Sequence, residues 1–194
     1  MVAKPRIGIL ALQGAVRPHV EKLERLGVEP VEVLTPYSLR SVEGLIVPGG
    51  ESTAFLHLIE MNNLWDALLE FSGEKPLWGI CAGAILMAAE VLHPAQRSLN
   101  VFDVTVERNA YGRQLQSFVS ALEPSPAWEE EEVEGVFIRA PRIKSLGARV
   151  VPLLSYKNET VMAREGKHLI STFHPELTES SAIHRYFLGL CGTA

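Results

Sequence analysis

The sequence predicts an α/β protein with a doubly wound, mostly parallel sheet, helices on both faces and a small antiparallel extension. Short apolar runs alternate with segments of helical periodicity up to about residue 92. Beyond Leu99 the segments become shorter and resemble hairpin strands. The 194 residues suffice for one domain with a sizeable core, whereas two would be cramped. We therefore expect a single domain over residues 1–194.

The first half supplies the parallel strands and the helices that connect them. We expect strands at residues 7–12, 28–34, 44–47 and 76–80. Helices should follow the first, third and fourth of these strands: one from Val16 to Gly27, one capped by Ser52 or Thr53 with a short one after Asn63, and a small-residue helix over residues 82–92. In such sheets ligands bind beyond the carboxyl ends of the strands, and the glycine-rich loops 48–52 and 79–83 both fall there.

The second half predicts the antiparallel part and a closing helix. Strands are expected at 101–107, 114–122 and 133–139, the first two joined as a hairpin by the turn at 109–112. Further strands are expected at 150–154, 161–164 and 169–173. Ile183, Tyr186, Phe187 and Leu190 recur at helical spacing and predict a last helix.

Composition argues against several classes of function. The net charge is −5 with scattered basic residues, so we expect neither nucleic acid nor anionic lipid as a partner. The apolar run at 7–12 is too short to span a membrane and has no signal-peptide cleavage site. Two isolated cysteines, Cys81 and Cys191, indicate a reducing cytoplasm rather than a disulfide scaffold, and no histidine pair has zinc-ligand spacing. No metal and no cofactor are expected.

Cys81 lies in the most informative segment, Gly79-Ile80-Cys81-Ala82-Gly83, between an apolar strand and a small-residue helix. This is the arrangement of a nucleophile elbow with cysteine in place of serine. The sharp turn strains the backbone, and the helix N-terminus favours a thiolate. The N–H of Ala82 can then face a developing oxyanion. A free cysteine is more often a small buried hydrophobe, but the flanking glycines favour a nucleophile here; Cys191 lacks them, and we assign it no role.

His174 and Glu176 are the candidate base and its orienting carboxylate. They lie in Phe173-His174-Pro175-Glu176 at the end of a predicted strand, on the same edge as Cys81. The remaining histidines favour exposed or capping roles: His19, His57 and His184 on helices, His93 before a proline and His168 after a turn.

The loop Pro48-Gly49-Gly50-Glu51-Ser52 is the third element of the candidate site. Two glycines let the backbone approach a ligand closely and supply a second oxyanion donor. Taken alone, the loop fits a plain strand-to-helix turn better. No Gly-Lys-Ser/Thr follows, so it is not a phosphate loop.

Together these motifs resemble class I (triad) glutamine amidotransferases, and more narrowly the glutaminase subunits of pyridoxal 5′-phosphate synthases. The matching blocks are residues 10–16, 48–53, 106–109 with 112–114, 135–141 and 173–178. The resemblance implies a flavodoxin-like fold and hydrolysis of glutamine to glutamate and ammonia. It also implies a (β/α)₈-barrel synthase subunit as partner, which uses the ammonia with a pentose phosphate and a triose phosphate.

The resemblance further implies which residues bind glutamine: Gly50, Glu51, Ser52, Arg108, Ile138 and Arg139, with an oxyanion hole at Gly49, Gly50 and Ala82. An arginine can pair with the α-carboxylate of glutamine. Spacing alone does not distinguish Arg108 and Arg139 from Arg113 and Arg142. Two alternatives stand beside this interpretation: a glutaminase that feeds a different acceptor enzyme, and a non-catalytic regulator or chaperone on the same scaffold. The second predicts a lone cysteine without the His-Pro-Glu segment.

Overall fold

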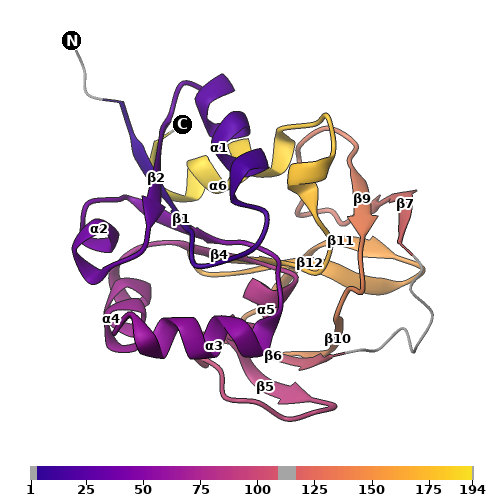
Figure 1. The fold of residues 1–194 in the computed structure, drawn as a ribbon. Coiled ribbons are helices and arrows are strands. Elements are labelled where there is room, and N and C mark those ends of the chain that lie inside the picture. The colour runs from indigo at the N-terminus through magenta and orange to yellow at the C-terminus, as the bar shows by residue number, and fades with distance from the viewer. Residues whose placement is uncertain (1–3, 109–116, 194) are drawn as a thin grey trace.

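The computed structural model describes residues 4–108 and 117–193, and within them an eight-stranded sheet forms the centre of the molecule (Figure 1). The strand order is β2-β1-β3-β4-β13-β12-β11-β8. The strands from β2 to β13 run parallel, and β12, β11 and β8 continue the sheet in antiparallel fashion. The strands are β1 (Arg6–Leu10), β2 (Glu29–Val33), β3 (Gly44–Val47), β4 (Leu77–Ile80), β8 (Glu123–Pro124), β11 (Val151–Tyr156), β12 (Glu159–Glu165) and β13 (His168–Ser171).

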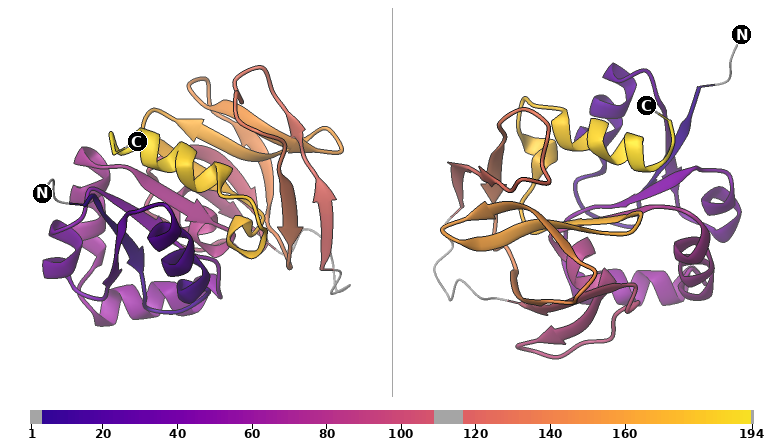
Figure 2. Two further views of the ribbon diagram at one scale, coloured as in Figure 1. Left: turned by 90° about the horizontal axis from the view of Figure 1, so that it is seen from above. Right: turned by 180° about the vertical axis from the view of Figure 1, so that it is seen from behind.

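Helices cover both faces of this sheet, as the sequence predicts (Figures 1 and 2). α1 (Val16–Arg25) and α6 (Ala182–Leu190) lie on one face, and α3 (Ser52–Met61), α4 (Trp65–Glu74) and α5 (Ala82–Met87) lie on the other. α2 (Pro36–Arg40) lies beside β2, and the short 3₁₀ helix η1 (Pro175–Leu177) precedes α6.

The apolar side chains on both faces of the buried strands explain why helices pack on both sides of the sheet. Along β3, Ile46 belongs to the apolar cluster under α1 and α6, whereas Leu45 and Val47 belong to the cluster under α3, α4 and α5. Both faces of a central parallel strand must therefore be apolar, which is why these strands read as continuous hydrophobic runs. The predicted doubly wound, mostly parallel fold is confirmed. No helix within the described residues has the length and apolar character needed to cross a membrane.

The predicted helix at 82–92 is wrong in its second half. α5 ends at Met87, and Ala88 begins β5 (Ala88–Leu92). A continued helix would place Glu90 one turn after the buried Leu86, on the same face. The strand instead turns Glu90 to the surface, where its carboxylate accepts a hydrogen bond of 3.0 Å from the hydroxyl of Thr105.

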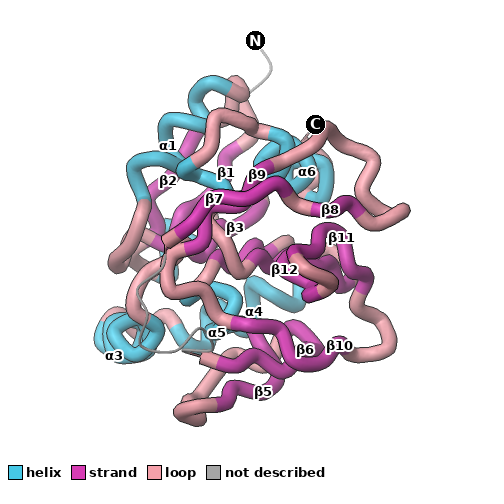
Figure 3. Tube along the Cα trace, turned by 90° about the vertical axis from the view of Figure 1, so that its right-hand side faces the viewer, coloured by secondary structure: helices cyan, strands magenta, loops and turns pink. Residues whose placement is uncertain are grey.

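The predicted hairpin between residues 101–107 and 114–122 is also wrong. β6 (Phe102–Glu107) pairs with β5 and with β10 (Arg142–Leu146), whereas β7 (Phe118–Ala121) pairs with β9 (Glu134–Phe137). The two small sheets lie at separate places in the molecule (Figure 3). Alternating burial along a strand does not specify its partner, and β10 was not predicted. The turn at 109–112 and residues 113–114 lie outside the described residues.

Candidate active site

Cys81 occupies a strained turn between β4 and α5, with φ 50° and ψ −102°. Its backbone N–H donates to the carbonyl of Ser171 on the neighbouring strand at 2.8 Å. The flanking glycines are required by close approach: a Cβ on Gly83 would lie 2.1 Å from the carbonyl oxygen of Val47, and one on Gly79 would lie 2.6 Å from Gly83. The turn therefore has the strained geometry that the Gly-x-Cys-x-Gly segment predicts.

His174 follows β13 at the same edge of the sheet. Its N–H donates to the carbonyl of Val136 at 2.8 Å, and its Nδ1 lies 2.7 Å from Oε1 of Glu176, which η1 holds in a buried position. Burial by itself lowers the pKa of His174, but hydrogen bonds with Cys81 and Glu176 and the charges of both groups raise it to about 10. With Nδ1 committed to Glu176, Nε2 is the ring nitrogen available to Cys81.

The loop after β3 packs tightly around the histidine. A Cβ on Gly49 would lie 2.4 Å from Cε1 of His174, so only glycine fits there. The Gln13 amide holds the loop in place: its Nε2 donates to the carbonyl of Glu51 at 2.5 Å, and its Oε1 accepts from the Glu51 N–H at 3.4 Å. Ala82 is the first residue of α5, so its N–H has no acceptor within the helix.

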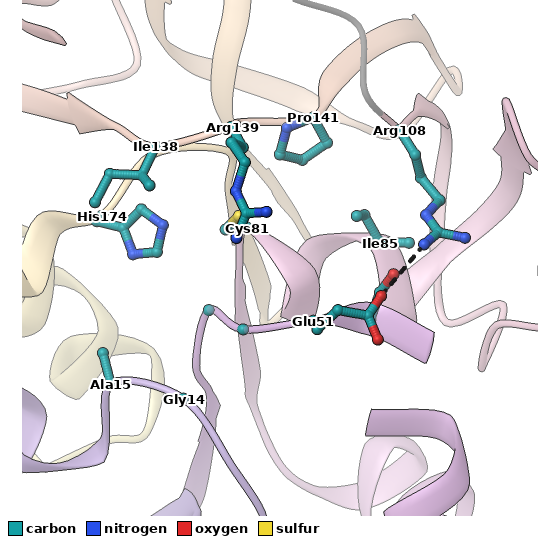
Figure 4. A pocket seen from close by; sticks show the side chains of 13 residues that line it. Gly14, Ala15, Glu51, Cys81, Ile85, Arg108, Ile138, Arg139, Pro141 and His174 are labelled. Carbon is teal, nitrogen blue, oxygen red and sulfur yellow. Dashed lines mark ion pairs between the residues drawn. The ribbon is translucent and has the colours of Figure 1, made fainter. Parts of the chain in front are cut away.

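A cavity of about 350 Å³ opens in front of Cys81 and His174 (Figure 4). It lies beyond β1 and β3, where the strand order changes direction and doubly wound sheets bind their ligands. The lining residues are Gly14, Ala15, Gly49, Gly50, Glu51, Ser52, Cys81, Ile85, Arg108, Ile138, Arg139, Pro141 and His174. Every residue predicted to bind glutamine is among them. Ala82 and Glu176 are buried behind this surface.

Glu51 and Arg108 form the polar wall of the cavity. The Glu51 carboxylate accepts from the N–H groups of Thr53 at 3.1 Å and Ala54 at 2.7 Å, and lies 3.5 Å from the guanidinium of Arg108. Partial burial raises the pKa of Glu51, but these bonds and the arginine lower it overall. Glu51 is therefore the cap of α3, and the predicted cap at Ser52 or Thr53 is wrong. The Ser52 hydroxyl instead donates to Gln96 at 2.9 Å.

Of the four candidate arginines, Arg108 and Arg139 line the cavity at Cys81, whereas Arg142 does not. Arg139, with a positive φ of 46°, lines the same cavity as Cys81 (Figure 4). Arg142 pairs with Glu159 at 2.9 Å and lines a different cavity, near Phe118. Arg113 lies outside the described residues.

Sequence reasoning missed four residues that line the cavity: Gly14, Ala15, Ile85 and Pro141. Gly14 and Ala15 lie in the loop between β1 and α1, so the rule that placed Gly49 at the carboxyl edge of the sheet also places them there.

The predicted exposed or capping roles of His19 and His184 are wrong, because both side chains are buried completely or almost so. His19 lies one helical turn before Leu23 on the face of α1 that packs on the sheet. Burial lowers the pKa of His19 to about 4 and that of His184 well below its usual value.

Comparison with known proteins decides which chemistry this arrangement serves. The model of the SNO glutamine amidotransferase family matches residues 9–192. The chain belongs to this family. A pyridoxal 5′-phosphate synthase subunit PdxT of Solibacter usitatus is 46% identical over 187 residues, covering 94% of this chain and 97% of that protein. PdxT of Thermotoga neapolitana is 47% identical over 184 residues, with the same coverage.

Solved structures agree with this assignment. A crystal structure of a glutamine amidotransferase superposes with a TM-score of 0.88 at 45% identity, covering 96% of this chain and 98% of that one. PurLQS of Thermotoga maritima, with a TM-score of 0.75 at 17% identity, shares the fold. The chain is thus a glutamine amidotransferase, and the family resemblance inferred from the sequence motifs is confirmed.

Proposed function

We propose that this SNO-family glutamine amidotransferase is the glutaminase subunit of a pyridoxal 5′-phosphate synthase. It hydrolyses L-glutamine to L-glutamate and ammonia, and the ammonia passes to a barrel-shaped synthase subunit. The observation that carries the proposal is the elbow cysteine beside the buried His174–Glu176 pair, open to a cavity of about 350 Å³. The cavity is of the size that holds a small ligand.

The first half of the reaction forms a thioester. The Cys81 thiolate attacks the δ-carbonyl carbon of glutamine, and the N–H of Ala82 with that of the Gly49–Gly50 loop holds the oxyanion. The His174 imidazolium, with its pKa of about 10, is protonated at neutral pH. It donates that proton to the departing nitrogen, which leaves as ammonia.

The second half releases glutamate. Neutral His174 takes a proton from water, the hydroxide attacks the thioester, and the Cys81 sulfur leaves as the thiolate while His174 keeps the proton. Glu176 holds Nδ1 of the imidazole in both halves, which fixes the ring tautomer. The active site thereby returns to its starting state.

Substrate recognition follows from the charges that line the cavity. Arg139 and Arg108 are the cations that pair with the α-carboxylate, and Glu51 is the carboxylate that faces the α-ammonium group. Ser52, Gly50 and Ile138 complete the wall around the side chain of the substrate. We further propose that the chain acts in the cytoplasm as one domain; Cys81 and Cys191 are both free thiols.

The experiment combines the chain with a pyridoxal 5′-phosphate synthase barrel subunit and measures glutamate release and cofactor formation from a pentose phosphate and a triose phosphate. Cys81→Ala should abolish glutamine hydrolysis, and added ammonium salt should restore cofactor formation. Cys191→Ala is the matched control and should keep wild-type turnover. Ammonia release by Cys81→Ala would refute the catalytic assignment. Failure of the barrel to use glutamine nitrogen would point to another acceptor.

Dependence on the partner is a second expected outcome. The Gly49–Gly50 loop must present an N–H to the oxyanion, and docking of the partner orients it, so the isolated chain should turn over glutamine slowly. Removing one oxyanion donor costs about 10²–10³ in turnover. Equal rates for the isolated chain and the complex would contradict this dependence.

A further inference from the structure

Glu176 faces a second histidine on the side away from His174. Its Oε1 lies 2.7 Å from Nδ1 of His174, whereas its Oε2 faces Nε2 of His19 at 3.8 Å. His19 in turn contacts His184, with 3.0 Å between Nδ1 of the first ring and Nε2 of the second. The side chains of His19 and Glu176 are fully buried. A line of buried polar groups therefore runs from the active site to α6.

This line is assembled from separate elements: α1 supplies His19, η1 supplies Glu176 and α6 supplies His184. The Trp78 ring of β4 packs edge-on against both imidazoles, with centroid distances of 5.9 and 4.9 Å. The charged groups that act on His19 are Glu176, His174 and Lys22, the last of which donates to the carbonyls of Thr178 and Ser180. Lys22 and His19 are the groups that act on His184.

The protons on this line can be placed by elementary chemistry. Both buried imidazoles are neutral near pH 7, because burial lowers the pKa of each, so each ring carries one N–H. A carboxylate only accepts hydrogen bonds, and a ring nitrogen lone pair turned toward it would repel it. His19 must therefore carry its proton on Nε2. His184 then donates from Nε2 to Nδ1 of His19.

We propose that His19 is a positioning residue of the active site, whose Nε2–H holds the second oxygen of Glu176 so that the first keeps His174 aimed at Cys81. This inference rests on the proposed function. In this structure 3.8 Å is too long for a hydrogen bond, and the described residues give Oε2 of Glu176 and Nε2 of His19 no other partner. We expect this distance to shorten when substrate binds, as it does for catalytic hydrogen bonds that are long in a site without substrate. Without the Nε2–H of His19, no donor among the described residues would fix the position of Oε2 of Glu176.

The experiment compares His19→Leu with His19→Gln in the chain assembled with its synthase partner. Leucine fills the space without a donor, whereas the glutamine amide restores one near the position of Nε2. We expect His19→Leu to lower kcat about tenfold or more with KM nearly unchanged, and His19→Gln to recover most of the loss. His168→Leu is the matched control, because His168 is a half-buried histidine whose ring contacts the N–H of Leu77 at 3.1 Å and the backbone of Ser72 rather than a residue of the active site. It should keep the wild-type kcat.

A second measurement separates positioning from packing. The rate at which iodoacetamide alkylates Cys81, followed from pH 6 to pH 9, reports on the Cys81–His174 pair without any glutamine. His19→Leu should lower this rate in the wild-type background and leave it unchanged in a Glu176→Gln background, because His19 acts through the carboxylate. Wild-type kcat in His19→Leu, or the same fractional loss of alkylation rate in both backgrounds, would overturn the proposal. A wild-type complex that leaves glutamine intact refutes the proposed function, while the alkylation series still tests His19.

Discussion

Two regions of this molecule each contain a cysteine and a histidine, and the pKa values of the two histidines are shifted in opposite directions. In the edge region, Cys81 and His174 lie at the carboxyl end of the sheet, and the pKa of His174 is raised to about 10. In the α6 region, burial raises the pKa of Cys191 to about 12, helped by the nearby Glu43 charge, and lowers the pKa of His184. The edge region therefore favours the charged form of His174, and the α6 region favours the neutral forms of His184 and Cys191.

Burial alone does not explain the difference. Cys81 is only 7% exposed, and Cys191 is more accessible than that. What differs is the partner: Cys81 faces an imidazole backed by Glu176, whereas Cys191 packs against Phe187 and Gly44. The proposed nucleophile is thus the thiol that has a positioned base beside it.

The largest expected effect is selectivity between the two thiols. With a pKa of about 12, roughly one Cys191 thiol in 10⁴ or fewer is ionised at pH 7.5. Cys81 shares a hydrogen bond with the His174 imidazolium, so iodoacetamide should modify it at least about 10³ times faster. Peptide mass spectrometry of the native protein measures both rates, and the urea-unfolded chain is the control in which they should converge. Similar alkylation rates for Cys81 and Cys191 in the native protein would show that the two regions do not differ in thiol reactivity.

Low pH should destabilise the fold, because the buried side chains of His19 and His184 are neutral in the folded chain. The pKa of His19 is lowered to about 4 in the folded chain and is near 6.5 when unfolded. The unfolded chain thus binds the extra proton between these values, so stability is fully present above pH 6.5 and is lost as pH falls toward 4. The loss is on the order of 3 kcal/mol for His19 alone.

Urea titrations at pH 7 and pH 4.5 measure that loss, and His19→Gln should reduce the difference between the two pH values because it removes the titrating group. An identical pH dependence in His19→Gln and the wild type would show that this histidine does not titrate on unfolding.

One methyl group added at Gly83 should strain the turn that holds Cys81. In Gly83→Ala the new Cβ would lie 2.1 Å from the backbone oxygen of Val47, which cannot move without shifting β3. We expect a loss of about 1–3 kcal/mol in unfolding free energy together with lower glutaminase activity. Gly73→Ala is the matched control, because no atom lies within 4 Å of its Cβ on α4. It should be neutral or stabilising by up to about 1 kcal/mol. Denaturant unfolding of the pair measures both.

The edge region could largely be predicted from the sequence because its signals are local. Gly79, Cys81 and Gly83 encode a turn within five residues, and the rule that parallel strands present their carboxyl ends together places His174 beside it. The cavity and its predicted lining followed from the same rule and from the family resemblance. No long-range pairing had to be guessed for these elements.

The remaining parts depend on contacts between residues far apart in the chain. β6 pairs with β10 across about 40 residues, and nothing in either strand specifies that partner. His19 and His184 meet across 165 positions, and the charged residues beside each of them in sequence do not show that its helix buries it. Glu51 caps α3 with its own carboxylate, whereas the Ser52 hydroxyl donates to Gln96, a contact no local rule supplies.

The smallest expected effect is that of Cys191, whose sulfur acts as packing. A Cβ on Gly44 would lie 2.4 Å from its Sγ, so the thiol fills the space above β3 that glycine leaves. Cys191→Ala should cost about 1 kcal/mol or less and leave glutaminase activity unchanged. Gly44→Ala alone should be more harmful, and Cys191→Ala should relieve it in the double variant, giving a favourable coupling in a thermodynamic cycle. Purely additive costs would mean that the sulfur does not pack there, and any loss of turnover in Cys191→Ala would give the α6 region a part in catalysis.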